Sequence, residues 1–531
     1  MALHPRYKNP GSNKFSPQNI HNGWRDVESG ALNARAEENP DNPEFSEAAS
    51  VLDKIGDVDV ARAEYLEKTE TKHDLVAAIR AMGEQVDAIE PGKNLGRLIH
   101  QGLTSYDTED TAMSLLLANA GKDIMGEMTK TLDSLIFKAS TFKYAPQNGY
   151  THSQVAEPIT IGKRFLDAAV GVKEQMGEFE NNIKKINVCK IKGATGVYSG
   201  SLSPEFEAKV ARKLGQQVSK CATQILPIQD LIPFFNPFLV MAAYIENLCY
   251  SICLSSGDLA EMQEGTISTQ TGSSVMAFKD NPINAENTIG SCRKIKALNN
   301  ELAYATMSLR ERDISGSFQV VRHIIPEFFE TMWHICLKAR FVSDGLVVIP
   351  IQALRNVNKY GDFIFAGAAK DLIATEFSNR DNKGIYDLVK KVSKDAKKAA
   401  NFRDEHQSIV NGLESEIRAI GGDDGTMARL RKVTSLPYNL RNIHGVYKVA
   451  GIQRSVSESS IHDHLADHII ASGQMKDLKK SDSAKFIETY ANVVRANYDN
   501  YHVNGELYNN LEKAMSRLIK ELASIHAINS Y

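Results

Sequence analysis

The chain has 531 residues, of which 42% are hydrophobic and 24% are charged, so it can bury more than one large core as a globular protein of two or more domains. Its formal net charge of −3 gives no overall field that would favour nucleic acid or an anionic membrane, and any phosphate needs a local site. The six cysteines show no C-x-x-C pair, which favours a reducing compartment, the cytoplasm.

The first predicted domain covers residues 1–105, where short helical patterns are broken by polar and Gly/Pro segments. Residues 1–19 are polar. They contain neither the apolar stretch of a signal peptide nor the Arg/Ser pattern of a transit peptide, so we expect no export.

The second predicted domain covers residues 106–360 and the third covers 361–531. Apolar residues recur at three- and four-residue spacing over long stretches of 106–360, which predicts antiparallel helices packed as a bundle. Its most apolar stretch, 225–254, also contains prolines and polar side chains, and predicts a buried core helix rather than a lipid-spanning one. Residues 361–531 return to amphipathic helices. We therefore expect an all-α fold of three domains with a central long-helix bundle.

The segment from 259 to 288 lies between two long helical patterns. Residues 259–275 lack apolar periodicity and are rich in Gly, Ser and Thr, as a mobile loop or lid would be. The sequence TGSSVMAFKDNPINAEN occupies 271–287. Taken alone, it is equally well an ordinary loop and helix start, because Asn281-Pro282 is a common N-cap followed by proline at the first helical position.

Segment 271–287 resembles the signature loop of the fumarase/aspartase superfamily, G-S-S-x-M-P-x-K-x-N-P. Residues 100–112 and 149–164 resemble two further motifs of that superfamily, H-x-G-x-T-S-x-D-x-x-D-T-A and T-H-x-x-x-A-x-P-x-T-x-G. Without the resemblance, the polar residues of the first motif would be helix N-caps and the histidine of the second an ordinary one. Ala277 stands where the loop pattern has proline, and Asp280 where adenylosuccinate lyases have arginine, which places an acid beside an anionic site. The loop matches at Gly272, Ser273, Ser274, Met276, Lys279, Asn281 and Pro282.

Three other stretches resemble the adenylosuccinate lyases of this superfamily: KHDLVAAIR at 72–80, RERDISGS at 310–317, and the Arg6-Tyr7 pair. The likeness covers about residues 5–410 and leaves an extension from about 411, whose role stays open. It implies the three-domain fold of the superfamily and a homotetramer in which three subunits share each active site. It implies no metal and no other cofactor.

The implied reaction is anti β-elimination of fumarate from adenylosuccinate, giving AMP, and from the succinylated aminoimidazole carboxamide ribonucleotide of purine biosynthesis. Such a reaction needs a base, an acid and stabilisation of a carboxylate on which charge develops. By resemblance, Ser273 is the base, His152 is the acid that Glu286 tunes, and Lys279 binds that carboxylate. The residues implied to bind substrate are Arg6, Tyr7, Lys72, His73, Asp74, His100, Thr104, Ser105, Asp107, Thr151, Gln224, Ser274, Met276, Asn281, Arg312, Ser317 and Arg322.

The sequence leaves three alternatives to these expectations: another lyase specificity, a scaffold role and a metal site. The signature loop and the His152 motif are shared with other fumarate-releasing lyases, such as argininosuccinate lyase. The departures at Ala277 and Asp280, with the extension, also fit a non-catalytic helical scaffold. Finally, His464 and His468 in IHDHLADH have a spacing compatible with zinc, although we expect a solvated polar face there with Ile461, Leu465, Ile469 and Ile470 packed inward.

Overall fold

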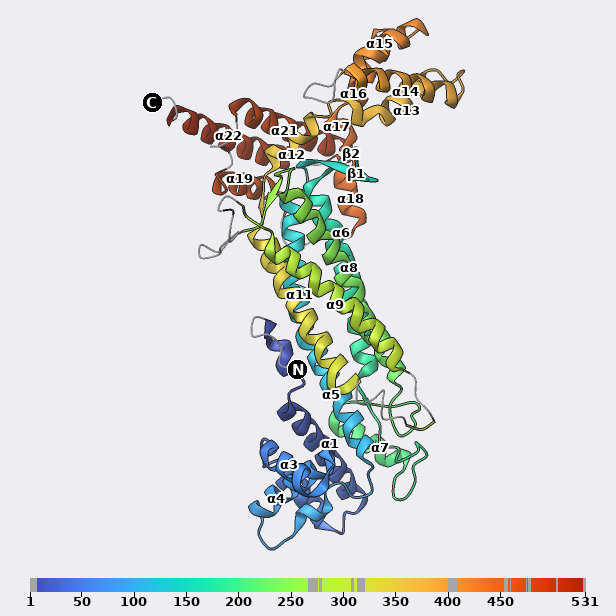
Figure 1. Ribbon diagram of the computed structural model, residues 1–531, viewed down its shortest axis with the longest axis vertical. Helices are drawn as coiled ribbons and strands as arrows, with labels where there is room; N and C mark the ends of the chain where they lie inside the picture. The colour runs from blue at the N-terminus through green and yellow to red at the C-terminus, as the bar shows by residue number, and fades with distance from the viewer. Residues whose placement is uncertain are drawn as a thin grey trace. The chain divides into compact units, whose positions relative to one another are not determined.

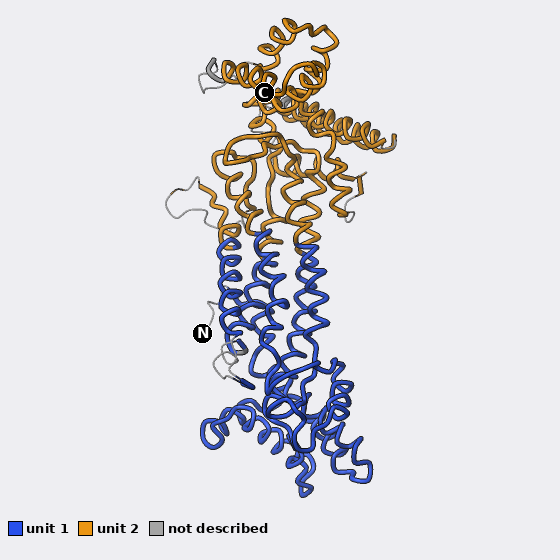
Figure 2. Tube along the Cα trace, turned by 90° about the vertical axis from the view of Figure 1, so that its right-hand side faces the viewer, with its two compact units in different colours: residues 1–130, 172–245, 288–337 blue, residues 131–171, 246–287, 338–531 orange. Residues whose placement is uncertain are grey.

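The computed structural model describes residues 7–265, 276, 279–306, 310–312, 320–399, 408–452, 457–458, 460–473, 475, 479–502 and 505–528. Helices dominate these ranges, and the only sheets within them are short and two-stranded (Figure 1). The predicted all-α class is confirmed. The chain divides into two compact units, each built from three segments (Figure 2). Unit 1 comprises 1–130, 172–245 and 288–337, and unit 2 comprises 131–171, 246–287 and 338–531.

The long helical patterns of the sequence correspond to five long helices whose residues belong partly to each unit. They are α5 (Ser105–Thr141), α6 (Ile161–Ile186), α8 (Leu231–Ser256), α9 (Ile283–Ala305) and α11 (Ile325–Gly345). Within unit 1, α8 and α11 share an aromatic core in which the rings of Phe235 and Phe328 stack at 4.2 Å between centroids. Burial of such rings is a large stabilising contribution to the core.

Helix α8 is the most apolar helix described, as the sequence predicted. Together with the turn before it, Ile228–Ser256 is long and apolar enough to cross a membrane by length and composition alone. Core helices of soluble proteins have the same composition, and half of its most apolar window is buried inside the structure. Leu254 nevertheless remains 71% exposed, so part of an apolar face is left uncovered by this chain.

The rest of unit 1 packs short helices around one apolar core. Helix α1 begins after Ser16, whose hydroxyl accepts a hydrogen bond from the Asn19 N–H, with Pro17 at the first position. Its buried face carries Trp24 and Val27. The elements are η2 (Pro10–Asn13), α1 (Pro17–Glu38), α2 (Pro43–Leu52), α3 (Val60–Leu66), η3 (Glu67–Thr71), α4 (Asp74–Ile89), η4 (Leu95–Leu98), β3 (Val188–Cys189), α7 (Pro204–Leu214), β4 (Gln217–Val218), η5 (Ile228–Asp230) and η6 (Val320–Ile324).

Unit 2 contains two short antiparallel sheets and the C-terminal helices. Strand β1 (Pro146–Thr151) pairs with β2 (Gln154–Thr160), and β5 (Met262–Gln263) pairs with β6 (Val347–Val348). Helices α13 to α16 have a small core of their own around Ile373, Ile409 and Leu413. The helices are α12 (Pro350–Asn358), η7 (Phe363–Phe365), α13 (Ala366–Glu376), α14 (Asn382–Ala399), α15 (Ile409–Ala419), α16 (Asp424–Val433), α17 (Leu436–Asn439), α18 (Ile443–Val449), α19 (Ile461–Ala471), α21 (Lys480–Tyr501) and α22 (Gly505–Ile528).

The histidines of α19 are held by packing. His462 is fully buried, with its Nδ1 2.9 Å from the Tyr490 hydroxyl and its Nε2 2.8 Å from the Tyr498 hydroxyl. Burial lowers the pKa of His462 to about 4, so the ring stays neutral near pH 7. His468 Nε2 lies 3.1 Å from the Val348 N–H nitrogen. The prediction of a solvated polar face is therefore wrong for His462, and the described residues contain no cluster suited to a metal ion.

Candidate active site

Asp107, in the first turn of α5, is the centre of a buried ion pair in unit 1. One carboxylate oxygen accepts the Thr104 N–H at 3.0 Å. The other accepts Lys190 Nζ at 2.8 Å and the Lys192 N–H at 3.0 Å. Both charged side chains are fully buried. The hydrogen bonds of Asp107 therefore go to the protein itself, and they fix the loop that carries Thr104 and Ser105.

His100 is paired with a buried acid that the sequence did not single out. Its Nδ1 lies 2.7 Å from Glu28 Oε1, and Glu28 Oε2 accepts the His100 backbone N–H at 2.9 Å. The backbone at His100 has φ of 67°, in the left-handed region that a non-glycine residue rarely adopts. Burial alone would lower the pKa of His100, but the hydrogen bond and charge of Glu28, with the charge of Asp107, raise it above 6.5.

Replacing Glu28 with glutamine should lower the pKa of His100 below 6.5, because burial would then be largely unopposed. A histidine whose folded pKa is raised stabilises the fold below its unfolded pKa, and this stabilisation is lost as the pH rises through the folded pKa. Glu28→Gln should therefore destabilise the chain most at acid pH. An NMR titration of His100 in Glu28→Gln measures the expected fall in its pKa. Glu37→Gln, on the exposed side of α1, is the control. An unchanged His100 pKa in Glu28→Gln would contradict the pairing of His100 with Glu28.

Residues far apart in the sequence meet around His73, which precedes α4. Its Nε2 lies 3.4 Å from Ser105 Oγ, and its Nδ1 lies 3.4 Å from the Asp74 carboxylate. That carboxylate accepts the Arg322 guanidinium at 2.6 Å. Lys72, in the left-handed conformation at the end of η3, directs its ammonium to the Lys68 carbonyl. The structure thus brings residues of two sequence motifs, 72–80 and 100–112, together with Arg322 in an exposed polar cluster.

A second arginine lies beside this part of α5. Arg312 donates to Gln224 Oε1 at 3.1 Å and stacks on Tyr106, with 4.0 Å from its Cζ to the ring centroid.

Burial, with the nearby charges of Asp74 and Asp110, raises the pKa of Glu109 to about 8, although Arg312 and Arg322 oppose the shift. Sequence reasoning missed Glu109. The one available signal was an acid beside Asp110 in the first turns of a buried helix.

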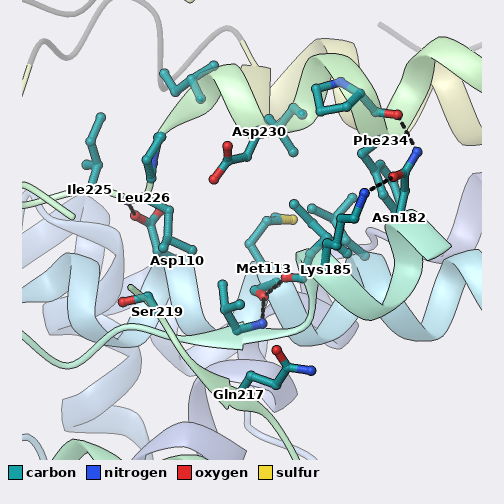
Figure 3. A pocket seen from close by; sticks show the side chains of 18 of the residues that line it. Asp110, Met113, Asn182, Lys185, Gln217, Ser219, Ile225, Leu226, Asp230 and Phe234 are labelled. Atoms are coloured by element: carbon teal, nitrogen blue, oxygen red, sulfur yellow. Dashed lines mark hydrogen bonds between the residues drawn. The ribbon is translucent and has the colours of Figure 1, made fainter. Parts of the chain in front are cut away.

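Two cavities adjoin these residues in unit 1. One, of about 340 Å³, is bounded by Lys8, Arg322 and His323. Tyr7 comes directly before Lys8, and its ring lies 4.9 Å from that of His334. The other, of about 440 Å³, is mainly apolar. Figure 3 shows Asp110 on one side of it, accepting the Leu226 N–H at 2.6 Å. Burial raises the pKa of Asp110 to about 7.

In unit 2, His152 lies at the tip of the β1–β2 hairpin. Thr151 pairs with Gln154, so His152 and Ser153 form a two-residue turn. Both have positive φ, 50° and 59°, as the type I′ turn of a tight hairpin requires. Most such turns use Asn and Gly, so a histidine here costs conformational energy. The turn exposes the imidazole to solvent.

The described end of the signature loop leads into α9. The Lys279 N–H donates to the Met276 carbonyl at 3.0 Å, and both side chains are exposed. Asn281 precedes α9, and Glu286 lies in the first turn of that helix. Asp280, the departure from the family pattern, accepts a hydrogen bond from Gln263 of β5 at 3.1 Å. Four predicted residues lie outside the described part of the chain: Arg6, Ser273, Ser274 and Ser317.

Comparison with known proteins shows the family and the fold of the chain. A family model described as "Lyase" matches residues 13–296. An adenylosuccinate lyase of Bacillus subtilis is 29% identical over 84% of this chain and 99% of its own length. That of Staphylococcus saprophyticus is 30% identical over 67% of this chain and 80% of its own. A fumarate lyase structure from Mesorhizobium sp. BNC1 has a TM-score of 0.72 at 18% identity, over 85% of this chain and 100% of its own, and shows the shared fold. The chain is an enzyme that belongs to the lyase family that includes the adenylosuccinate lyases.

Proposed function

We propose that this lyase releases fumarate from adenylosuccinate, giving AMP, and from the succinylated aminoimidazole carboxamide ribonucleotide. The observation that carries the proposal is the cluster of His73, Asp74, Ser105 and Arg322. Arg312, which donates a hydrogen bond to Gln224, adds a second guanidinium group. These groups suit an anionic substrate, since guanidinium groups bind phosphates and carboxylates through paired hydrogen bonds. The buried Nε of Arg312 has no hydrogen-bond partner among the described residues, and it could donate to such an anion.

The proposed chemistry needs a proton removed from the carbon beside a carboxylate and another delivered to the departing nitrogen. We assign removal to Ser273 and delivery to His152, whose imidazole can act as the general acid. Lys279 and Asn281 would bind the carboxylate on which negative charge develops. A serine hydroxyl is a weak base, so surrounding cationic and N–H groups must favour its alkoxide while water is excluded.

We propose that the active enzyme is a homotetramer in which different subunits supply the motifs of one site. The candidates within one chain belong to different compact units: His73, His100 and Arg312 to unit 1, and His152, Lys279 and Glu286 to unit 2. The half-buried apolar helix α8 supports the same proposal, because a second copy would cover side chains such as Leu254.

We place this enzyme in the cytoplasm, to which its six free cysteines are suited.

Mixing two inactive variants tests the shared site. His73→Ala and His152→Ala should each lose most activity, and a mixture that is dissociated and reassembled should regain part of it, because some sites then receive neither substitution. The variants assembled separately and mixed without dissociation serve as control. No recovery in reassembled tetramers would place both histidines in a site formed by one subunit.

The reaction itself is tested by following fumarate release from adenylosuccinate, its imidazole counterpart and argininosuccinate. Fumarate from the first two alone is the expected result. Fumarate from argininosuccinate would transfer the assignment to a different lyase specificity. If a folded tetramer released no fumarate from any of the three substrates, a scaffold role would be favoured.

A further inference from the structure

A buried carboxylate in unit 2 connects the strand that ends beside His152 to the strand that precedes the signature loop. The side chain of Glu261 is fully buried. Its Oε2 accepts the side-chain amide of Gln147, in β1, at 2.5 Å. Its Oε1 accepts the side-chain amide of Asn356, in α12, at 2.9 Å. A single acid therefore joins three elements that are distant in the sequence.

The backbone of Glu261 is held as firmly as its side chain. Its N–H donates to the Ser255 carbonyl at the end of α8, and its carbonyl accepts the Ile349 N–H, both at 2.8 Å. The next residue, Met262, pairs with Val348 across the β5–β6 sheet. These bonds fix the backbone from which the Glu261 carboxylate projects.

Among the described residues, the Glu261 side chain is hydrogen-bonded to two amides, and one of these amides connects it to a cation. The Gln147 oxygen accepts Arg164 Nε at 2.6 Å, while its nitrogen donates to Glu261. Arg164 also donates to the Asn148 carbonyl in β1 at 3.0 Å. A buried charge is costly unless every partner is in place, and this chain of bonds allows only one orientation of the Gln147 amide. Such a network sets the position of β1 more strictly than apolar packing would.

Glu264, in the same short segment, holds the beginning of α9. Its two carboxylate oxygens accept the backbone N–H groups of Asn284 and Ala285 at 3.0 and 3.1 Å, across a separation of 20 residues in the first case. These are the N–H groups that a helix leaves without internal partners, and a negative charge there also favours the helix dipole. Glu286 follows directly in the first turn.

We propose that Glu261 is a positioning residue for the elimination: it fixes the His152 hairpin relative to the 261–264 segment, from which Glu264 fixes the start of α9. The inference rests on the proposed function. It assigns to Glu261 no contact with substrate. Its removal should therefore lower kcat more than it raises KM, because most of the described substrate-binding candidates belong to unit 1, and only Thr151, Met276 and Asn281 belong to unit 2.

Glu261→Gln tests this role. The side chains of Gln147 and Asn356 both donate to Glu261, so the amide nitrogen of the introduced glutamine would face one of these donors and one hydrogen bond would be lost. We expect kcat to fall by about 10²-fold, the effect of a displacement near 1 Å in a catalytic group. The double variant Glu261→Gln with Gln147→Glu exchanges the two side chains. The carboxylate at 147 can then accept from both Arg164 and the amide at 261, whose oxygen accepts from Asn356, so this variant should recover most of kcat. Gln352→Ala is the control, since the Gln352 side chain donates to Asn356 Oδ1 at 3.0 Å and, among the described residues, is not hydrogen-bonded to Glu261 or Gln147.

Thermal unfolding and tetramer content are measured alongside kcat for each variant. A folded Glu261→Gln tetramer with wild-type kcat would overturn the inference, as would a folded double variant that recovers nothing. If Glu261→Gln does not fold, Gln147→Asn replaces it, because the shorter amide cannot reach both Arg164 and Glu261; wild-type kcat in that variant would likewise overturn the inference. A wild-type enzyme that releases no fumarate would instead overturn the proposed function.

Discussion

Replacing Ser273 with alanine is expected to reduce fumarate release by about 10³-fold or more, the scale on which loss of a proton-transferring group acts. The substitution removes only one hydroxyl group, so the variant should fold and assemble as the wild type does. Turnover of adenylosuccinate by purified variant and wild type, with thermal unfolding of both, measures the effect.

Ser268→Ala is the matched control for that experiment. It removes a hydroxyl from the same Gly/Ser/Thr-rich segment at a position outside the signature motif, and we expect activity within about twofold of wild type if the motif alone carries the chemistry. Near-normal turnover in Ser273→Ala would exclude Ser273 as the base. Equal losses in both variants would indicate a general effect on the loop.

Replacing Asp107 with alanine is expected to destabilise the fold by about 3–5 kcal/mol, because it leaves Lys190 fully buried without its carboxylate partner. The backbone N–H groups of Thr104 and Lys192 would lose an acceptor in the same change. Urea unfolding of the variant and the wild type measures the difference. Activity should fall as well, since Thr104 and Ser105 depend on this loop.

The surface pair Lys184–Glu180 provides the contrast, because its side chains are 66% and 61% exposed. Lys184→Ala should change stability by less than about 1 kcal/mol. The double variant Asp107→Leu with Lys190→Met should recover part of the stability lost in Asp107→Ala, since it removes both buried charges. Equal stability of Asp107→Ala and wild type would show that the buried ion pair is not needed.

The resemblance found in the sequence identified the motifs but not their partners. His100 and Asp107 both lie in one motif, yet the structure gives them different surroundings: His100 pairs with Glu28, and Asp107 with Lys190. Glu28 and Lys190 come from other parts of the chain, with no local pattern to mark them as partners. The same is true of Glu109, whose raised pKa depends on burial and on Asp74 and Asp110.

The C-terminal helices show a similar difference. The histidine spacing at 461–468 was compatible with a metal site or with a polar surface, and neither interpretation included Tyr490 and Tyr498, which enclose His462. The division of the chain into three consecutive domains remains a prediction, since the two compact units are each assembled from three separated segments. Contacts between distant segments decide that grouping, and a linear pattern does not record them.

By itself, the sequence determined the all-α class, the presence of long helices between 106 and 360 and the motifs that mark the lyase family. Those features depend on helical periodicity and on neighbouring residues, which are local properties. Only the tertiary structure decided which side chains meet: Arg322 with Asp74 across 248 positions, His100 with Glu28 across 72, and Gln147 with Glu261 across 114. The physical reason is that a buried charge or polar group must find its partner wherever the packed chain places one.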